Sequence, residues 1–135
     1  MARPLLLNRG VRLRVSAALV WLALVWALAG CITPSIPIPP PDPEQMTFDV
    51  TVDTGSATFS YSPSPYDGAI VYVLNRATGS GVIDKARDDG SVGPTLPFPA
   101  KLGDSIIVSF ERDSQTASTC IVVRQGRQSS ADLCR

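Results

Sequence analysis

The sequence predicts an all-β protein whose folded part, residues 46–135, is a small sandwich of about seven strands. Three observations lead to this prediction. From Met46 onward, apolar and polar residues alternate in short runs, which is the pattern of half-buried strands. Turn-forming pairs such as Asp67-Gly68 separate these runs at intervals of about 8–12 residues. This part also lacks the apolar spacing of an amphipathic helix.

The first half of the domain contains two alternating runs followed by one continuous apolar run. Residues 48–53 and 57–62 alternate, with Val52 in the apolar set, so each run should form a strand with one buried face. Residues 69–74 are apolar throughout, which predicts a central strand covered on both faces. A weaker strand is expected at residues 82–86.

The second half begins with a segment that proline confines to the edge of a sheet. Residues 91–99 have an extended pattern but contain three prolines, which cannot donate hydrogen bonds to a neighbouring strand. After a turn at residues 102–104, residues 106–111 alternate again and predict another strand. We expect the last strands at residues 120–123 and from Ser129 onward.

These short strands and tight turns indicate an immunoglobulin-like sandwich, with a small barrel as the alternative. The segments Asp89-Gly90-Ser91, Leu96-Pro97 and Gly103 to Val108 together resemble bacterial immunoglobulin-like adhesion repeats and carboxypeptidase-regulatory-like β-domains. The resemblance covers about residues 69–123 and departs from the families in the prolines after the Asp-Gly-Ser turn. It implies the fold and implies no activity.

The N-terminal region has the organisation of a secretory signal. The first fourteen residues contain four arginines and no acidic residue, and residues 15–28 carry no charge. A basic start, a short apolar run and small residues at its end are the three parts of a cleavable signal peptide. A membrane-spanning helix needs about 20 apolar residues, so this run is too short to cross comfortably.

The end of the apolar run, Leu28-Ala29-Gly30-Cys31, resembles the lipobox of bacterial lipoproteins. The resemblance implies cleavage before Cys31, with Leu28, Ala29 and Gly30 recognised by the signal peptidase. It also implies that a lipid is attached to the Cys31 thiol and anchors the protein to a membrane. The alternatives are an ordinary signal peptide with an incidental cysteine, and an uncleaved anchor.

The residue after Cys31 bears on which membrane would hold the anchored protein. In Gram-negative lipoproteins, Asp at this position tends to retain the protein in the inner membrane. Ile32 occupies it here, so the resemblance favours the outer membrane for a Gram-negative source.

A proline-rich segment separates the cysteine from the domain. Residues 32–45 contain six prolines, which exclude helix and sheet and favour polyproline II. At about 3.1 Å per residue, such a segment spans roughly 40 Å. We therefore expect residues 31–45 to be a semi-rigid tether, with a proline-rich recognition segment as the alternative.

With Cys31 assigned to lipid, Cys120 and Cys134 remain as a pair, which predicts a disulfide in an exported domain. If the chain folds back at residues 126–128, the two cysteines face each other across an antiparallel hairpin. Such a bridge closes a 15-residue loop, which is worth about 3 kcal/mol in the chain-entropy description. The alternative is a C-terminal loop that is bridged but is not a strand.

Composition excludes several classes of function. The full chain has 12 basic and 12 acidic residues, so loss of the four leader arginines leaves a net charge of about −4 and no basic stripe for nucleic acid. The chain has no histidine, which removes the commonest general base and metal ligand. We therefore expect no enzymatic activity, no metal and no cofactor beyond the lipid.

Two groups of residues are candidate ligand sites. The acidic residues Asp84, Asp88 and Asp89 could hold Ca²⁺. Because they lack the EF-hand spacing, we expect them to form a solvated turn instead. Three tyrosines could line a glycan or peptide surface: Tyr61, Tyr66 and Tyr72. The alternative, which we favour, places Tyr72 in the core and packs Tyr66 on the loop that contains Pro63 and Pro65.

Taken together, these features predict a lipid-anchored protein of the cell envelope. Its single β-sandwich would act as a non-enzymatic structural or interaction module. The alternative is a protein that binds a glycan, a peptide or a small ligand through the loops of the sandwich.

Overall fold

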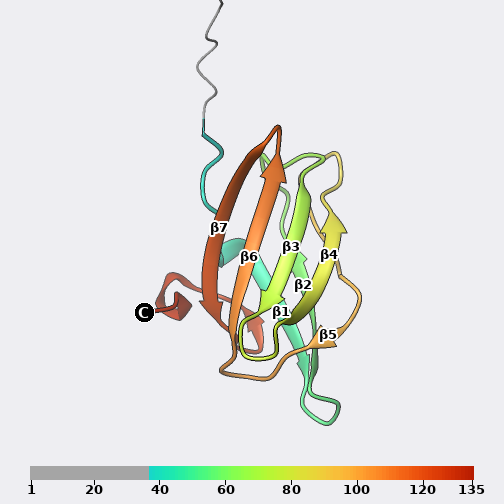
Figure 1. The fold of residues 1–135 in the computed structure, drawn as a ribbon, viewed down its shortest axis with the longest axis vertical. Coiled ribbons are helices and arrows are strands. Elements are labelled where there is room, and N and C mark those ends of the chain that lie inside the picture. Colours follow the sequence, from blue (N-terminus) through green and yellow to red (C-terminus); the bar gives the residue numbers. More distant parts are fainter. Residues whose placement is uncertain (1–36) are drawn as a thin grey trace, which may run out of the picture. The chain divides into compact units, whose positions relative to one another are not determined.

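Two four-stranded antiparallel sheets pack face to face and form a sandwich (Figure 1). The structure is a computed structural model that describes residues 37–135. One sheet has the strand order β5-β2-β1-β8 and the other has the order β4-β3-β6-β7. The elements in chain order are η1 (Pro43–Gln45), β1 (Met46–Thr51), β2 (Ser56–Tyr61), β3 (Ile70–Asn75), β4 (Ser80–Lys85), β5 (Phe98–Pro99), β6 (Ser105–Arg112), β7 (Gln115–Val122), β8 (Gly126–Arg127) and η2 (Ser130–Asp132). The predicted small all-β sandwich is confirmed, with eight strands instead of about seven.

The first hairpin follows the alternation in the sequence. Strand β1 pairs with β2 from Met46↔Tyr61 to Thr51↔Ser56, and buried and exposed residues alternate strictly along β1. Phe48 of this pair is fully buried. Val52 departs from the expectation, because it is 73% exposed in the turn that follows β1. The prediction that residue 52 continues the buried face is therefore wrong: the strand ends before it.

Strand β3 is an interior strand, as predicted, but only one of its faces is covered in the part of the chain that the structure describes. It lies between β4 and β6 and directs Val71 and Val73 into the core. The other face is open, and Leu74 is 42% exposed on it. The prediction of a strand covered on both faces is wrong, because a two-layer sandwich has no third layer to cover the outside of a sheet.

The proline-bearing segment lies at a sheet edge, as predicted. Strand β5 pairs with β2 alone, and Val92 forms an isolated bridge with Tyr61. Strand β4 also appears where a weak strand was expected, although it begins at Ser80.

The β6–β7 hairpin is longer than the sequence indicated. Strand β7 begins at Gln115, whereas the expected strand covered only residues 120–123. The turn uses Asp113 and Ser114 with φ values of 52° and 64°, the left-handed region that a two-residue hairpin turn requires. Because neither residue is glycine, the turn has no strong sequence signal.

Aromatic side chains from both sheets meet in the core. Phe48 and Phe59 have ring centroids 5.1 Å apart, and Tyr61 lies 4.9 Å from Phe110. Tyr66, from the connection between β2 and β3, stacks on Phe110 at 4.3 Å. The core is therefore shared between the two sheets.

The folded unit begins at Pro37, nine residues before the predicted domain boundary at Met46. Residues 37–45 lie against the sandwich, with Ile38 packed on the core and Pro41 buried. The prediction that all of residues 31–45 is a free-standing spacer therefore does not hold for residues 37–45. A composition rich in proline indicates the backbone conformation but carries no sign of what the segment packs against.

Candidate functional site

The residues of the predicted lipidation site lie outside the described part of the chain. These are Leu28, Ala29, Gly30 and Cys31, together with Ile32 after the cysteine. Their roles stay predictions. Within residues 37–135, no helix has the length and apolar character to cross a membrane.

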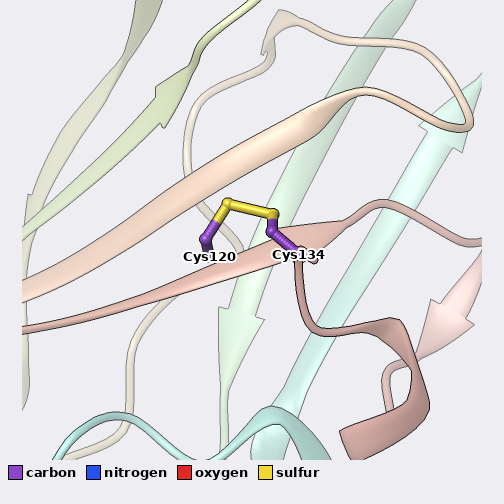
Figure 2. The surroundings of a disulfide bond; sticks show 2 residues. All are labelled: Cys120 and Cys134. Carbon is purple, nitrogen blue, oxygen red and sulfur yellow. A yellow bond between two sulfur atoms is a disulfide. The ribbon is translucent and has the colours of Figure 1, made fainter.

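The predicted disulfide forms between Cys120 of β7 and Cys134 near the C-terminus (Figure 2). The two sulfur atoms are 2.03 Å apart and the Cα atoms are 5.3 Å apart. The Cys134 amide donates to the Cys120 carbonyl over 3.0 Å, and Ile121 forms a bridge with Leu133. The predicted antiparallel facing of the two cysteines is therefore confirmed.

The chain between the two cysteines is not the predicted hairpin. Strand β8 leaves β7 and pairs with β1 in the other sheet, and the short helix η2 follows it. The alternative expectation, a bridged tail that is not a continuous strand, describes this region. The disulfide thus joins the last residues to β7, although β8, which lies between the two cysteines in the chain, pairs in the other sheet.

A capping box that was not predicted from the sequence holds the start of η2. Both the backbone amide and the hydroxyl of Ser129 donate to the Asp132 carboxylate over 2.9 Å, and Arg124 forms an ion pair with it. Burial opposes ionisation of Asp132, but the hydrogen bonds from Ser129 and the charge of Arg124 outweigh burial and lower its pKa. The Ser-x-x-Asp spacing was the signal that could have predicted it.

The proline-rich residues 37–42, called the strap below, lie against the sandwich and are held there by four hydrogen bonds. Ile38 donates its amide to the Gln115 side chain over 3.0 Å, and Asp42 donates its amide to the Tyr61 hydroxyl over 2.9 Å. Two hydroxyl groups donate to carbonyl oxygens of the strap: Tyr66 to Pro39 and Thr119 to Pro41. We call the four side chains from Tyr61, Tyr66, Gln115 and Thr119 the strap groove.

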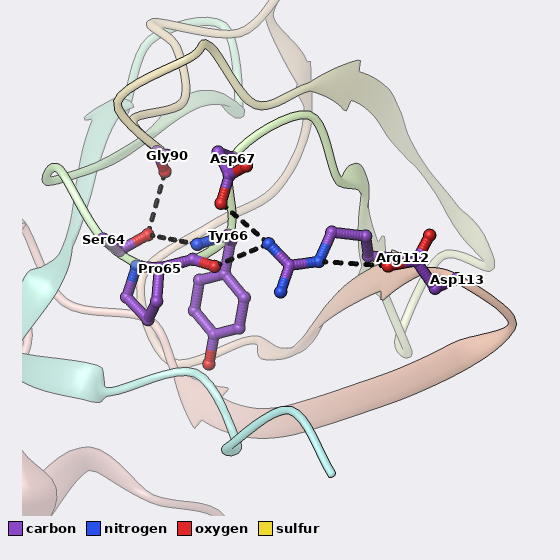
Figure 3. Close-up of polar contacts among 7 residues, drawn as sticks. All are labelled: Ser64, Pro65, Tyr66, Asp67, Gly90, Arg112 and Asp113. Atoms are coloured by element: carbon purple, nitrogen blue, oxygen red, sulfur yellow. Dashed lines mark hydrogen bonds and ion pairs between the residues drawn. The ribbon is translucent and has the colours of Figure 1, made fainter. Parts of the chain in front are cut away.

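A clamp around Arg112 fixes the loop that carries Tyr66 (Figure 3). The Arg112 guanidinium donates to the Pro65 carbonyl over 2.9 Å and to the Asp67 carboxylate over 2.7 Å. On the other side of the loop, the Ser64 hydroxyl donates to the Gly90 carbonyl over 2.9 Å. The Tyr66 ring is thereby held between this loop and Phe110.

The three tyrosines do not form one exposed surface. Tyr61 and Tyr66 are buried in the core, and burial is the main cause that raises the pKa of Tyr66 to about 12. Tyr72, which we expected in the core, faces the open side of β3, where a hydrogen bond with Glu111 is the main cause that raises its pKa. The reason is strand parity: Val71 and Val73 take the inward positions of β3, so Tyr72 points outward.

Of the three acidic residues, Asp88 and Asp89 belong to a turn, whereas Asp84 lies on β4. Asp89 accepts hydrogen bonds from the amide and the hydroxyl of Ser91 over 2.9 and 2.6 Å, and these bonds lower its pKa. Asp84 accepts from the amide of Lys85, and Asp88 is exposed. Within the described residues, no group of three potential metal ligands comes together.

Two adjoining hollows lie at the end of the sandwich opposite the β6–β7 turn. One, of about 380 Å³, is lined by Val50, Val52, Gly55, Lys101 and Leu102. The other, of about 470 Å³, shares Leu102 and continues along Val122 to Gln125. Hydrogen bonds from Ala100 to Gly55 and from Gly103 to Val123 tie the loops around them together. These hollows, called the end hollows below, are mostly apolar and were not predicted.

No family model, no curated protein and no solved structure matches the chain.

Proposed function

We propose that this chain is a bacterial lipoprotein whose β-sandwich serves as a non-enzymatic structural or interaction module at a membrane surface. The observation that carries the proposal is the tetrapeptide Leu28-Ala29-Gly30-Cys31 at the end of an apolar run that follows a basic N-terminus. The disulfide supports export, because such bonds persist in oxidising compartments.

Lipid labelling of the full chain in a bacterial host tests this proposal. Wild-type protein is expected to incorporate an alkyne analogue of palmitate and to sediment with membranes. The Cys31→Ser variant should lose both properties, because serine offers no thiol for the thioether. A matched control, the double variant Cys120→Ser and Cys134→Ser, replaces the two disulfide cysteines instead and should keep the label. Labelled Cys31→Ser protein would overturn the proposal.

Within this proposal, we place the protein at the outer membrane of a Gram-negative cell. Ile32 supports the placement, because it is not the Asp that favours retention at the inner membrane. Density-gradient separation of the two membranes is expected to find wild-type protein in the outer fraction and Ile32→Asp protein shifted to the inner fraction. Equal distribution of both proteins would contradict the placement.

A second candidate function is the binding of an apolar ligand or peptide at the end hollows. The observation that favours it is the exposure of large apolar side chains there, since Val52 is 73% and Leu102 is 52% exposed. Lys101 contributes a positive charge to the same rim. The hollows therefore suit an apolar ligand that carries a negative charge.

The dye 8-anilinonaphthalene-1-sulfonate is a suitable probe, because it is apolar and anionic. Its fluorescence is expected to rise with the folded protein and to lose most of that rise in Leu102→Asp protein. Ile83→Asp is the matched control, because Ile83 is 68% exposed on the outside of β4, away from the hollows. A rise that depends on Ile83 and not on Leu102 would count against this function.

A further inference from the structure

The strap is attached to the sandwich as a bound peptide is, and not as a strand. The four hydrogen bonds that join it to β2, β7 and the β2–β3 connection all involve a side chain of the strap groove. Its four prolines have no amide hydrogen to offer a neighbouring strand. Backbone-to-backbone pairing with the sandwich begins only at Gln45, whose carbonyl accepts from the Ser62 amide.

The burial of the strap's side chains, unlike its hydrogen bonds, follows a spacing of three residues. Ile38 is half-buried and Pro41 is buried, whereas Pro39 and Pro40 between them are exposed. Polyproline II has three residues per turn, so residues 38 and 41 lie on one side of such a helix. Aromatic and hydroxyl-bearing grooves bind proline-rich ligands in this manner, and the ligand loses little entropy because its conformation is already formed.

The position of Tyr66 does not depend on the strap, and the chain has a defined pivot at Asp42. Tyr66 is fixed by its stacking on Phe110 and by the Arg112 clamp, neither of which involves the strap. At the other end of the strap, the Asp42 carboxylate accepts from the Glu44 amide and caps η1. If the strap were released, the sandwich would therefore stay intact and the strap would turn about Asp42.

We propose that residues 37–42 are a releasable ligand of the domain's own strap groove, and that their docking sets the free length of chain between Cys31 and the domain. The second half of this statement rests on the proposed lipidation of Cys31. With the strap docked, the chain from Cys31 to Pro37 reaches at most about 20 Å. With the strap released as far as Asp42, the chain from Cys31 to Asp42 reaches roughly 34 Å as polyproline II.

Hydrogen exchange of the full chain tests the release, because Ile38 and Asp42 carry the amides that the strap donates to the groove. In wild-type protein, these two amides are expected to exchange at least tenfold faster than amides at the centres of β3 and β6, through an opening that leaves the sheets intact. Exchange at the same rate as the sheet centres would overturn the proposal, since the strap would then open only on global unfolding.

A pair of double variants separates the groove from general effects on stability. Tyr66→Phe with Thr119→Val removes two hydroxyl donors to the strap and should speed exchange at Ile38 and Asp42 tenfold or more. Tyr72→Phe with Thr116→Val makes the same chemical changes on the outer face of the sheet that contains β7 and should leave the exchange of both amides unchanged. Equal effects of the two pairs, or protection that rises with protein concentration, would contradict a groove filled by its own chain.

Energy transfer tests the change in reach. Trp21 and Trp26 fall in the segment that cleavage removes, so Ile83→Trp supplies a single donor in the processed chain. In vesicles of phosphatidylethanolamine and phosphatidylglycerol with a dansyl-labelled lipid, transfer should be weaker for the Tyr66→Phe, Thr119→Val protein than for its control. Equal energy transfer in the double variant and its control would contradict the proposed effect of docking on the free length of chain. Failure to bind vesicles contradicts the lipidation, whereas the exchange result still decides the release.

Discussion

Single residues hold the loops of this sandwich in place. Asn75 is fully buried, and its side-chain amide donates to the Pro99 carbonyl over 3.0 Å and to the Asp104 carboxylate over 2.7 Å. Its side-chain oxygen accepts from the Ala77 amide, so every part of this buried group has a partner. Gly90 acts differently, because it lets two loops approach closely.

Replacement of Gly90 by alanine is expected to be among the more damaging changes to a turn. Gly90 has φ near +75°, and an added Cβ would lie 1.9 Å from the Ser64 carbonyl oxygen. Gly79→Ala is the control, because Gly79 has a similar φ of +67° but open space around it. We expect a loss of about 1–2 kcal/mol for Gly79→Ala and a clearly larger loss for Gly90→Ala in urea denaturation. Equal losses would contradict the role of the close approach.

Tyr66 makes stability depend on pH in the alkaline range. Burial raises its pKa from 10.0 to about 12, so the folded state favours the neutral hydroxyl. The contribution of the neutral Tyr66 hydroxyl to the free energy of unfolding is complete below the pKa of the unfolded chain, near 10. It is lost as the pH rises toward 12, by up to about 1.4 kcal/mol per pH unit. Urea denaturation between pH 9 and 11.5 should show this decline, with a smaller slope in Tyr66→Phe protein. Identical slopes would argue against it.

At the scale of elements, the C-terminal segment depends on a few strong contacts. Strand β8 contributes two residues to its sheet, and η2 spans one short turn. The disulfide to β7 and the Asp132 capping box hold this segment on both sides. Without the disulfide, the last residues would be free to fray from β7.

Loss of the disulfide should therefore destabilise the domain as a whole. The double variant Cys120→Ser and Cys134→Ser is expected to unfold with a free energy about 3 kcal/mol below that of wild type, because the unfolded chain regains its loop entropy. The midpoint of urea denaturation measures this change, and reduction of the wild-type protein should reproduce it. An unchanged midpoint would show that the bridge contributes nothing to stability.

At the scale of the whole molecule, the two sheets share one core. Phe48 and Phe59 come from one sheet, Phe110 comes from the other, and Tyr61 and Tyr66 connect them. The strap begins beside the β6–β7 turn, whereas the end hollows lie at the opposite end of the sandwich. A ligand at the hollows would therefore bind far from the point where the chain leaves the domain.

A shared core predicts one cooperative unfolding transition. The near-ultraviolet circular dichroism of the core tyrosines and the far-ultraviolet signal of the strands should have the same urea midpoint. The strap amides are the expected exception, because they open locally. Loss of the tyrosine signal at a lower urea concentration than the strand signal would mean that the core and the sheets separate.

Much of the fold could be predicted from local patterns. Alternation placed β1, β2 and β6, proline placed β5 at an edge, and the even pair of cysteines predicted the disulfide. These features depend on side-chain parity, on missing amide donors and on residue counts, all of which are properties of short segments. The early start of β7 escaped prediction because its turn residues, Asp113 and Ser114, carry no glycine.

The sequence by itself determined the all-β class, most strand positions and the lipobox-like tetrapeptide on which the proposed function depends. Only the tertiary structure decided that, among residues 37–135, the outer face of β3 stays open, that Tyr66 is buried while Tyr72 is not, and that the strap is bound by side chains of the sandwich. The physical reason is that these outcomes depend on which surfaces meet. A strand's pattern distinguishes its two faces, but stacking of the sheets decides which face finds a partner.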